Sequence, residues 1–155
     1  MQYSSKGLPH LIPAIILTAP SSSEIILVSP WMENILLYPP PIGGRDYKVR
    51  TKTIHLGELL NYAIAKNRNR VTLIVREVDW RIQQITKDIP ESSSISLHSV
   101  DYLHAKLLIT DSRVIQTSAN FTRTSLYRNV ESCSILNNQH HSAKAYLQLE
   151  VGIYI

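Results

Sequence analysis

The residues of this chain that could do chemistry together lie in one stretch of its second half. His104 and Lys106 are two positions apart, so both side chains would project from the same face of a strand. Ser118 and Asn120 have the same spacing and follow residues 114–117, which predict another strand. A nucleophile or base, a fixed positive charge, a hydroxyl and an amide would then converge. Such a set suits a phosphate group.

The pattern resembles the His-Lys-Asp signature, HxKxxxxD followed by GSxN, of the phospholipase D superfamily, whose small nucleases also carry a downstream glutamate. The matching residues are His104, Lys106, Asp111, Ser118, Asn120 and Glu131. Thr117 stands where the family usually has glycine, and the gap after Asp111 is one residue short. The Cβ and hydroxyl of Thr117 could narrow the approach of a substrate phosphate, but neither departure removes a polar group.

The resemblance implies a covalent mechanism. His104 would attack the phosphorus of a phosphodiester and form a phosphohistidine, while Lys106 and Asn120 stabilise the charge on the phosphoryl oxygens. Ser118 would support the same oxyanion. Glu131 would accept a hydrogen bond from the other imidazole nitrogen of His104 and so fix its tautomer.

Asp111 is expected on the opposite face of its strand from His104, where it would hold neighbouring groups and not touch substrate. The mechanism needs a second histidine, to protonate the leaving oxygen and later to deprotonate water. The chain has one His-x-Lys and no internal repeat, so a symmetric homodimer that shares two copies of His104 is the simplest solution. No metal or other cofactor is expected, because lysine and amide groups would do the electrostatic work. The pair His140 and His141 lacks a Cys or carboxylate cluster at ligand spacing and favours an exposed helix start.

Trp31 follows a predicted strand whose carboxyl end, by the resemblance, lies beside the active site. It could stack on a base, although a place in the core or a dimer interface is the alternative. Lys48, Arg50 and Lys52 follow Tyr47 in a basic segment that suits a phosphate backbone. A solvated charged segment explains the same composition equally well.

Length and charge limit the possibilities. The 155 residues, of which 44% are hydrophobic, predict one domain over positions 1–155 with a substantial core. The net charge of +4 gives mild support to an anionic partner such as nucleic acid. Cys133 is the single cysteine, so no intrachain disulfide is possible, and a cytoplasmic location is expected. The apolar run 8–19 is interrupted by Pro9 and Pro13, which argues against a signal peptide, and it is too short to span a membrane. We therefore expect no stable membrane association.

Strand and helix patterns alternate along the chain. Besides the motif strands, the sequence predicts strands at 25–28, 71–75, 95–100 and 130–136, and helices at 8–19, 54–66, 79–87, 122–127 and 142–149. Strand 95–100 is expected to pair antiparallel with the motif strand. The prediction is an α/β fold with a mixed, mostly parallel sheet flanked by helices on both faces, the sandwich that the resemblance also implies.

Three functions fit these observations. The favoured one is a metal-independent hydrolase, a phosphodiesterase and endonuclease that cleaves nucleic acid, with DNA as the favoured substrate and without sequence specificity. A phospholipase-type or other phosphodiesterase is an alternative, supported weakly by the apolar run 36–38. A catalytically silent nucleic-acid-binding module is another, supported by Thr117 and the shortened turn.

Overall fold

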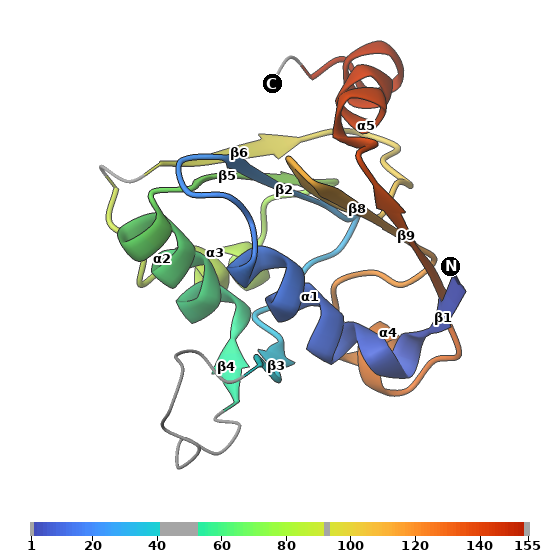
Figure 1. The fold of residues 1–155 in the computed structure, drawn as a ribbon, viewed down its shortest axis with the longest axis horizontal. Helices are drawn as coiled ribbons and strands as arrows, with labels where there is room; N and C mark the ends of the chain where they lie inside the picture. Colours follow the sequence, from blue (N-terminus) through green and yellow to red (C-terminus); the bar gives the residue numbers. More distant parts are fainter. Residues whose placement is uncertain (1, 41–52, 92–93, 154–155) are drawn as a thin grey trace.

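A computed structural model describes residues 2–40, 53–91 and 94–153 of the chain. Within these residues seven strands form one sheet in the order β1-β9-β8-β7-β2-β5-β6 (Figure 1). The strands of the sheet are β1 (Gln2–Ser4), β2 (Glu24–Val28), β5 (Arg70–Val75), β6 (Ile95–Ser99), β7 (Leu107–Thr110), β8 (Arg113–Thr117) and β9 (Ser132–Asn137). A separate two-stranded ribbon consists of β3 (Leu36–Leu37) and β4 (Ile54–His55). The helices are α1 (Leu8–Leu17), α2 (Leu56–Asn67), α3 (Trp80–Thr86), α4 (Arg123–Tyr127) and α5 (His140–Tyr146), with a 3-10 turn (Ser5–Gly7) before α1 and a π turn (Leu147–Val151) after α5.

The sheet is mixed. The pairs β2–β5 and β5–β6 are parallel, and the pairs β2–β7, β7–β8, β8–β9 and β9–β1 are antiparallel. Five of the seven strands in the described residues therefore run in one direction, and β7 and β9 run in the other. The predicted α/β class is confirmed.

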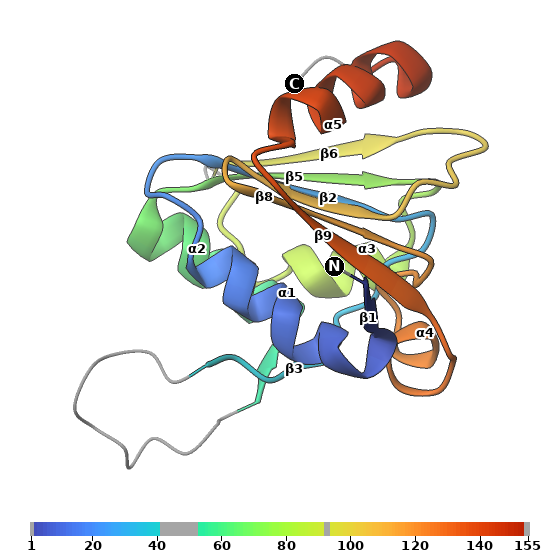
Figure 2. The same cartoon turned by 45° about the vertical axis from the view of Figure 1, so that its right-hand side comes forward.

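Helices cover both faces of the sheet. Figure 2 shows α1, α2, α3 and α4 on one face and α5 on the other. Strand β2 illustrates why: Ile25 and Leu27 pack into the core under α1 and α2, whereas Ile26 and Val28 pack with Leu147 after α5. Each such side chain contributes about 1.5–3 kcal/mol when fully buried. A strand that is apolar on both faces has to lie inside a sandwich.

The predicted helix starts agree with the structure in two cases. Asp79 and Thr122 cap α3 and α4 with side-chain oxygens that accept backbone N–H bonds. The helix expected from position 54 begins later, at Leu56. Ile54 and His55 instead pair with β3, so a strand contact replaces the first predicted turn.

The expected antiparallel pairing of strand 95–100 with the motif strand is wrong. β6 pairs in parallel with β5 at the edge of the sheet, while β7 lies in the interior between β2 and β8. All four residues of β7 are buried, but every residue of β6 is exposed or half-buried, so of these two strands β6 suits an edge. The connection between β6 and β7 carries His104 and Lys106. Both residues therefore precede the first strand residue, Leu107, and do not lie in a strand as expected.

No helix among the described residues has the length and apolar character needed to cross a membrane.

Candidate active site

The predicted site residues gather at one end of the strands. This is the edge of the sheet where β8 ends and where β7 and β9 begin. β7 begins at this edge opposite the end of β8, with Leu107 paired to Gln116, and β9 begins beside it, with Cys133 paired to Thr117. Residues just before β7, just after β8 and just before β9 must therefore be neighbours. These are His104, Lys106, Ser118, Asn120 and Glu131.

Ser118 and Glu131 are joined directly. Ser118 Oγ donates to Glu131 Oε2 at 2.6 Å and accepts the Ser132 N–H at 2.9 Å. Asn129 Nδ2 donates to Glu131 Oε1 at 3.1 Å. Both oxygens of the carboxylate thus accept hydrogen bonds, and bonds to a charged acceptor are the stronger kind. The bond expected between Glu131 and the His104 imidazole stays a prediction.

His104 is exposed and Lys106 is half-buried beside it. Lys106 Nζ donates to the His104 carbonyl oxygen at 2.7 Å, and the Lys106 carbonyl accepts the Thr117 N–H at 3.2 Å. An ammonium group has three N–H donors, so two remain for a bound anion. Both residues line a cavity of about 510 Å³ that also takes in Ser118 and, from α5, Tyr146.

Asn120 is held near the end of β2 by a residue that the sequence did not single out. Ser29 is fully buried, and its Oγ donates to the Trp31 carbonyl oxygen at 2.6 Å and accepts the Phe121 N–H at 3.1 Å. The same oxygen lies 3.5 Å from Asn120 Oδ1. In the sequence, the one sign of this role is that a serine followed by a proline ends a predicted buried strand. Its partners 91 and 92 residues away were not visible from the sequence.

Arg76 is a second residue that sequence reasoning missed. It follows β5, and its Nη2 donates at 2.7 Å to the carbonyl oxygen of Leu103, the residue before His104. Its guanidinium lies over the Trp31 ring, 4.6 Å from the centroid, in a cation–π contact. Trp31 remains 42% exposed. Arg76 therefore holds both Trp31 and the residue before His104 at the same edge of the sheet.

Asp111 and Thr117, which bound the shortened part of the motif, have clear positions. Asp111 lies in the turn after β7, at the opposite end of the strand from His104, so it is not among the converging residues. Thr117 is buried, and its Oγ1 donates to the Ser132 carbonyl oxygen at 2.8 Å and accepts the Ala119 N–H at 3.0 Å. The Thr117 hydroxyl thus stabilises the segment after β8 through two hydrogen bonds.

The remaining candidates do not join the site. Lys48, Arg50 and Lys52 lie outside the described residues. The rings of His140 and His141 lie in tilted contact at the start of α5, with centroids 4.0 Å apart. Across residues 2–40, 53–91 and 94–153, no group of three or more His, Cys, Asp or Glu side chains is placed to hold a metal ion.

Comparisons with known proteins give the family. A family model described as "Cardiolipin synthase, PLD-like domain" matches residues 55–150. Nuc from Salmonella typhimurium, a phospholipase D family member, is similar in structure with a TM-score of 0.57 and 18% identity, over 87% of this chain and 81% of Nuc. NucT from Helicobacter pylori has a TM-score of 0.58 and 12% identity, over 97% of this chain and 95% of NucT.

A larger protein shares the fold as well. Phosphatidylserine synthase from Haemophilus influenzae Rd KW20 has a TM-score of 0.65 and 14% identity over 95% of this chain, which spans 36% of that enzyme. No curated protein matches the sequence. At these identities the structural neighbours show the fold, whereas the family model covers more than half of the chain and includes every residue from His104 to Glu131. The chain therefore belongs to the phospholipase D superfamily, in the family of PLD-like domains that this model describes.

Proposed function

We propose that this protein is a metal-independent phosphodiesterase that cleaves nucleic acid, with DNA as its favoured substrate. The observation that carries the proposal is the convergence of His104, Lys106 and the Ser118–Glu131 pair at one edge of a phospholipase D-type sheet. Membership of the superfamily supports a phosphodiesterase-type function at the level of the family. The structural likeness to Nuc and NucT, both similar over most of their own length, supports a nuclease-type activity.

His104 is the proposed nucleophile. An imidazole nitrogen attacks the phosphorus, the bond from phosphorus to the leaving oxygen breaks, and a phosphohistidine forms. In this proposal the Lys106 ammonium and the Asn120 amide stabilise the phosphoryl oxygens as negative charge develops. Water then attacks the phosphohistidine and releases His104.

Ser118 has a narrower role in this proposal than its place in the motif indicates. Its hydroxyl proton already goes to Glu131, and its oxygen accepts the Ser132 N–H. Donation to a phosphoryl oxygen would require the bond to Glu131 to be exchanged. Ser118 therefore serves first to orient the carboxylate that would orient His104.

The leaving oxygen needs a proton from a second group. A symmetric homodimer with two exposed His104 residues across one cleft meets this need, because one copy can act as nucleophile and the other as general acid. We propose this dimer as the active form. Its test is the molar mass in solution, with a monomer at catalytic concentrations as the contrary result.

A second candidate activity is transfer or hydrolysis at a phospholipid headgroup. The description of the family model and the TM-score of 0.65 to phosphatidylserine synthase favour it. The cavity beside His104 is also partly apolar, since Leu107, Val114 and Ala143 line it. An apolar wall would suit the glycerol end of a lipid.

The deciding experiment is cleavage of plasmid and single-stranded DNA in excess EDTA. The wild-type protein and a His141→Ala control, changed at an exposed histidine outside the cavity, should cleave, and His104→Ala should not. Turnover of phosphatidyl substrates without cleavage of nucleic acid would establish the second candidate instead. Salt-sensitive binding of DNA without turnover of either substrate would reduce the protein to a binding module.

A further inference from the structure

Aromatic and cationic side chains, all exposed except the half-buried Arg76 and Arg81, continue the catalytic edge toward α3 and α4. Three segments that leave this edge supply them, 29–34 after β2, 76–81 after β5 and 118–128 after β8. Both tryptophans of the chain are among them, Trp31 at 42% exposed and Trp80 at 69% exposed. We call this set the tryptophan–arginine strip. Its members are Trp31, Arg76, Trp80, Arg81, Arg123 and Arg128.

Backbone contacts join the three segments into one surface. The Arg76 N–H donates to the Pro30 carbonyl oxygen at 3.1 Å. The Glu33 N–H donates to the Phe121 carbonyl oxygen at 2.9 Å, and the Arg123 N–H donates back to Glu33 Oε2 at 2.9 Å. Because Phe121 directly follows Asn120, the strip begins at the proposed catalytic site.

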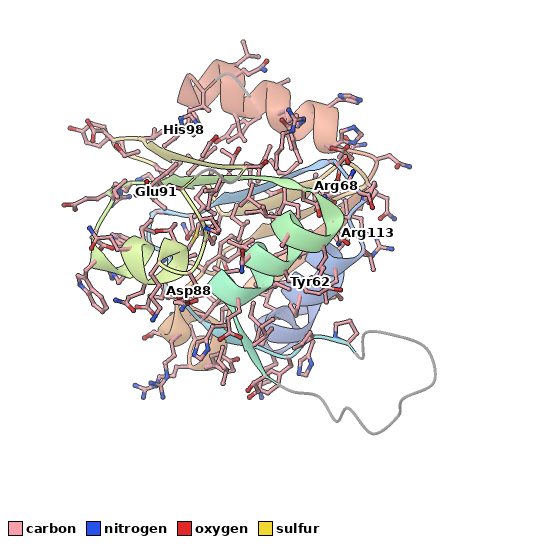
Figure 3. All side chains as sticks on the ribbon, turned by 90° about the vertical axis from the view of Figure 1, so that its left-hand side faces the viewer. Tyr62, Arg68, Asp88, Glu91, His98 and Arg113 are labelled. Carbon is pink, nitrogen blue, oxygen red and sulfur yellow. The ribbon has the colours of Figure 1, made fainter. Side chains whose placement is uncertain are left out.

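The far part of the strip surrounds a hollow. A cavity of about 790 Å³ is lined by Trp80, Arg81, Arg123 and Arg128. A neighbouring cavity of about 610 Å³ shares Arg123 and Arg128. Figure 3 shows the side of the molecule with α2 and α3 and labels Asp88, which also lines the larger cavity. Both volumes are within the range of sites that hold small organic ligands, so each can take a nucleotide-sized group.

The charges of the hollow are mixed, because Glu33, Glu58 and Asp88 line it as well as the cationic side chains. Asp79 bonds Arg81, and the pair raises the pKa of Arg81. Among the described residues no ion pair engages the exposed Arg123 or Arg128, so their guanidinium charges are available to a ligand.

A ligand for this strip must use both kinds of side chain. Arginine guanidinium groups bind phosphate oxygens in bidentate fashion, and an exposed indole offers a flat apolar face. Single-stranded nucleic acid meets both conditions, because its bases are free to stack on aromatic rings while its backbone follows the cations. A duplex keeps its base faces stacked inside, where Trp31 and Trp80 could not reach them.

We propose that the tryptophan–arginine strip binds single-stranded nucleic acid next to the cleavage site. Phosphates contact Arg123 and Arg128, one base stacks on Trp80, and a base nearer the scissile bond stacks on the part of the Trp31 ring that Arg76 does not cover. This inference rests on the proposed nuclease function and specifies its substrate as a single strand. It also adds Trp80, Arg123 and Arg128 to the residues that would select that substrate.

Intrinsic fluorescence tests the strip directly, because the only indoles of the chain lie in it. In a non-cleaving His104→Ala background, an oligo(dT) strand should quench the emission saturably, and a blunt hairpin duplex should not. Adding Trp31→Phe leaves Trp80 as the sole reporter, which should still be quenched. Trp80→Ala should weaken binding by about 5- to 150-fold, which corresponds to roughly 1–3 kcal/mol for one stacked base. Trp80→Phe should restore most of the affinity.

Arg128→Ala should weaken binding too, whereas Arg113→Ala should not. Arg113 is exposed at the start of β8, at the opposite edge of the sheet, and is labelled in Figure 3. In the wild-type background, Trp80→Ala and Arg128→Ala should lower kcat/KM for oligonucleotides. They should leave turnover of bis(p-nitrophenyl) phosphate unchanged, because that substrate is too small to reach the strip.

The outcomes separate the two proposals. Quenching by oligo(dT) with no cleavage by the wild-type protein would support the strip and overturn the nuclease. Cleavage that neither Trp80→Ala nor Arg128→Ala weakens, with no quenching of Trp80, would support the nuclease and overturn the strip. Equal quenching by strand and duplex would overturn the preference for single strands.

Discussion

Replacement of Ser29 by alanine should weaken both folding and catalysis, because one buried hydroxyl ties the end of β2 to the segment that carries Asn120. Ser29 is fully buried. The substitution removes the acceptor of the Phe121 N–H and the donor to the Trp31 carbonyl oxygen. It also removes the atom that lies 3.5 Å from Asn120 Oδ1.

The loss of stability follows from the orphaned groups. A buried N–H or C=O that loses its partner costs about 1–3 kcal/mol, and water has no access to Ser29 to replace the hydroxyl. A loss of about 2 kcal/mol would lower the Tm of a chain of this length by roughly 4–8 °C. The effect on kcat comes from the displaced amide. Removing an oxyanion donor outright lowers kcat by about 10²- to 10³-fold, and Asn120→Ala should show a loss of this size. Ser29→Ala only displaces the amide, so it should lower kcat less, by about tenfold.

Ser23→Ala is the matched control. Ser23 lies just before the other end of β2 and is also buried, and its Oγ donates to the Pro20 carbonyl oxygen and accepts from Asn69 Nδ2. Its loss should cost stability but not kcat. The assays are urea unfolding and DNA cleavage at a temperature where every variant is folded. If Ser29→Ala and Ser23→Ala kept the same kcat, Ser29 would have no part in positioning Asn120. An unchanged stability of Ser29→Ala would refute the hydrogen-bond argument itself.

Two further predictions concern α2 and α3. The side-chain bond from Arg81 holds the pKa of Asp79 below its ordinary value, so this carboxylate stabilises the fold above about pH 4 and the contribution is lost as the pH falls through the lowered pKa. Asp79→Asn should keep the helix cap but lose this pH dependence, whereas Asp79→Ala should also lower the free energy of unfolding at pH 7 by about 1 kcal/mol. Urea unfolding across a range of pH measures both effects. Equal pH profiles for the wild type and Asp79→Asn would contradict the prediction. Gly57→Ala should destabilise by about 1–3 kcal/mol despite its better helix propensity, because an added Cβ would lie 2.3 Å from the Ile85 carbonyl oxygen. Gly7→Ala, where no such contact arises, should be tolerated, and equal denaturation midpoints for the two variants would show that α2 moves to accept the methyl group.

Several elements could be predicted because they depend on residues that are close in the chain. The continuous apolar runs of β2 and β5 require burial on both faces, whatever their neighbours are. Asp79 and Thr122 each cap a helix through backbone groups two or three residues ahead. The motif positions 104–131 predicted the family, and the family model confirms it.

What the sequence determined by itself was therefore the set of elements and the list of motif residues. The tertiary structure decided which strands are neighbours, and so what else joins the site. β6 follows its helix to the edge of the sheet, and β7 takes the interior place that its four buried residues require. Ser29, Arg76 and Trp80 reach the catalytic edge only through this strand order. The physical reason is that strand pairing and burial depend on partners far away in the chain, as between Gln2 and Ser134, and no local pattern records them.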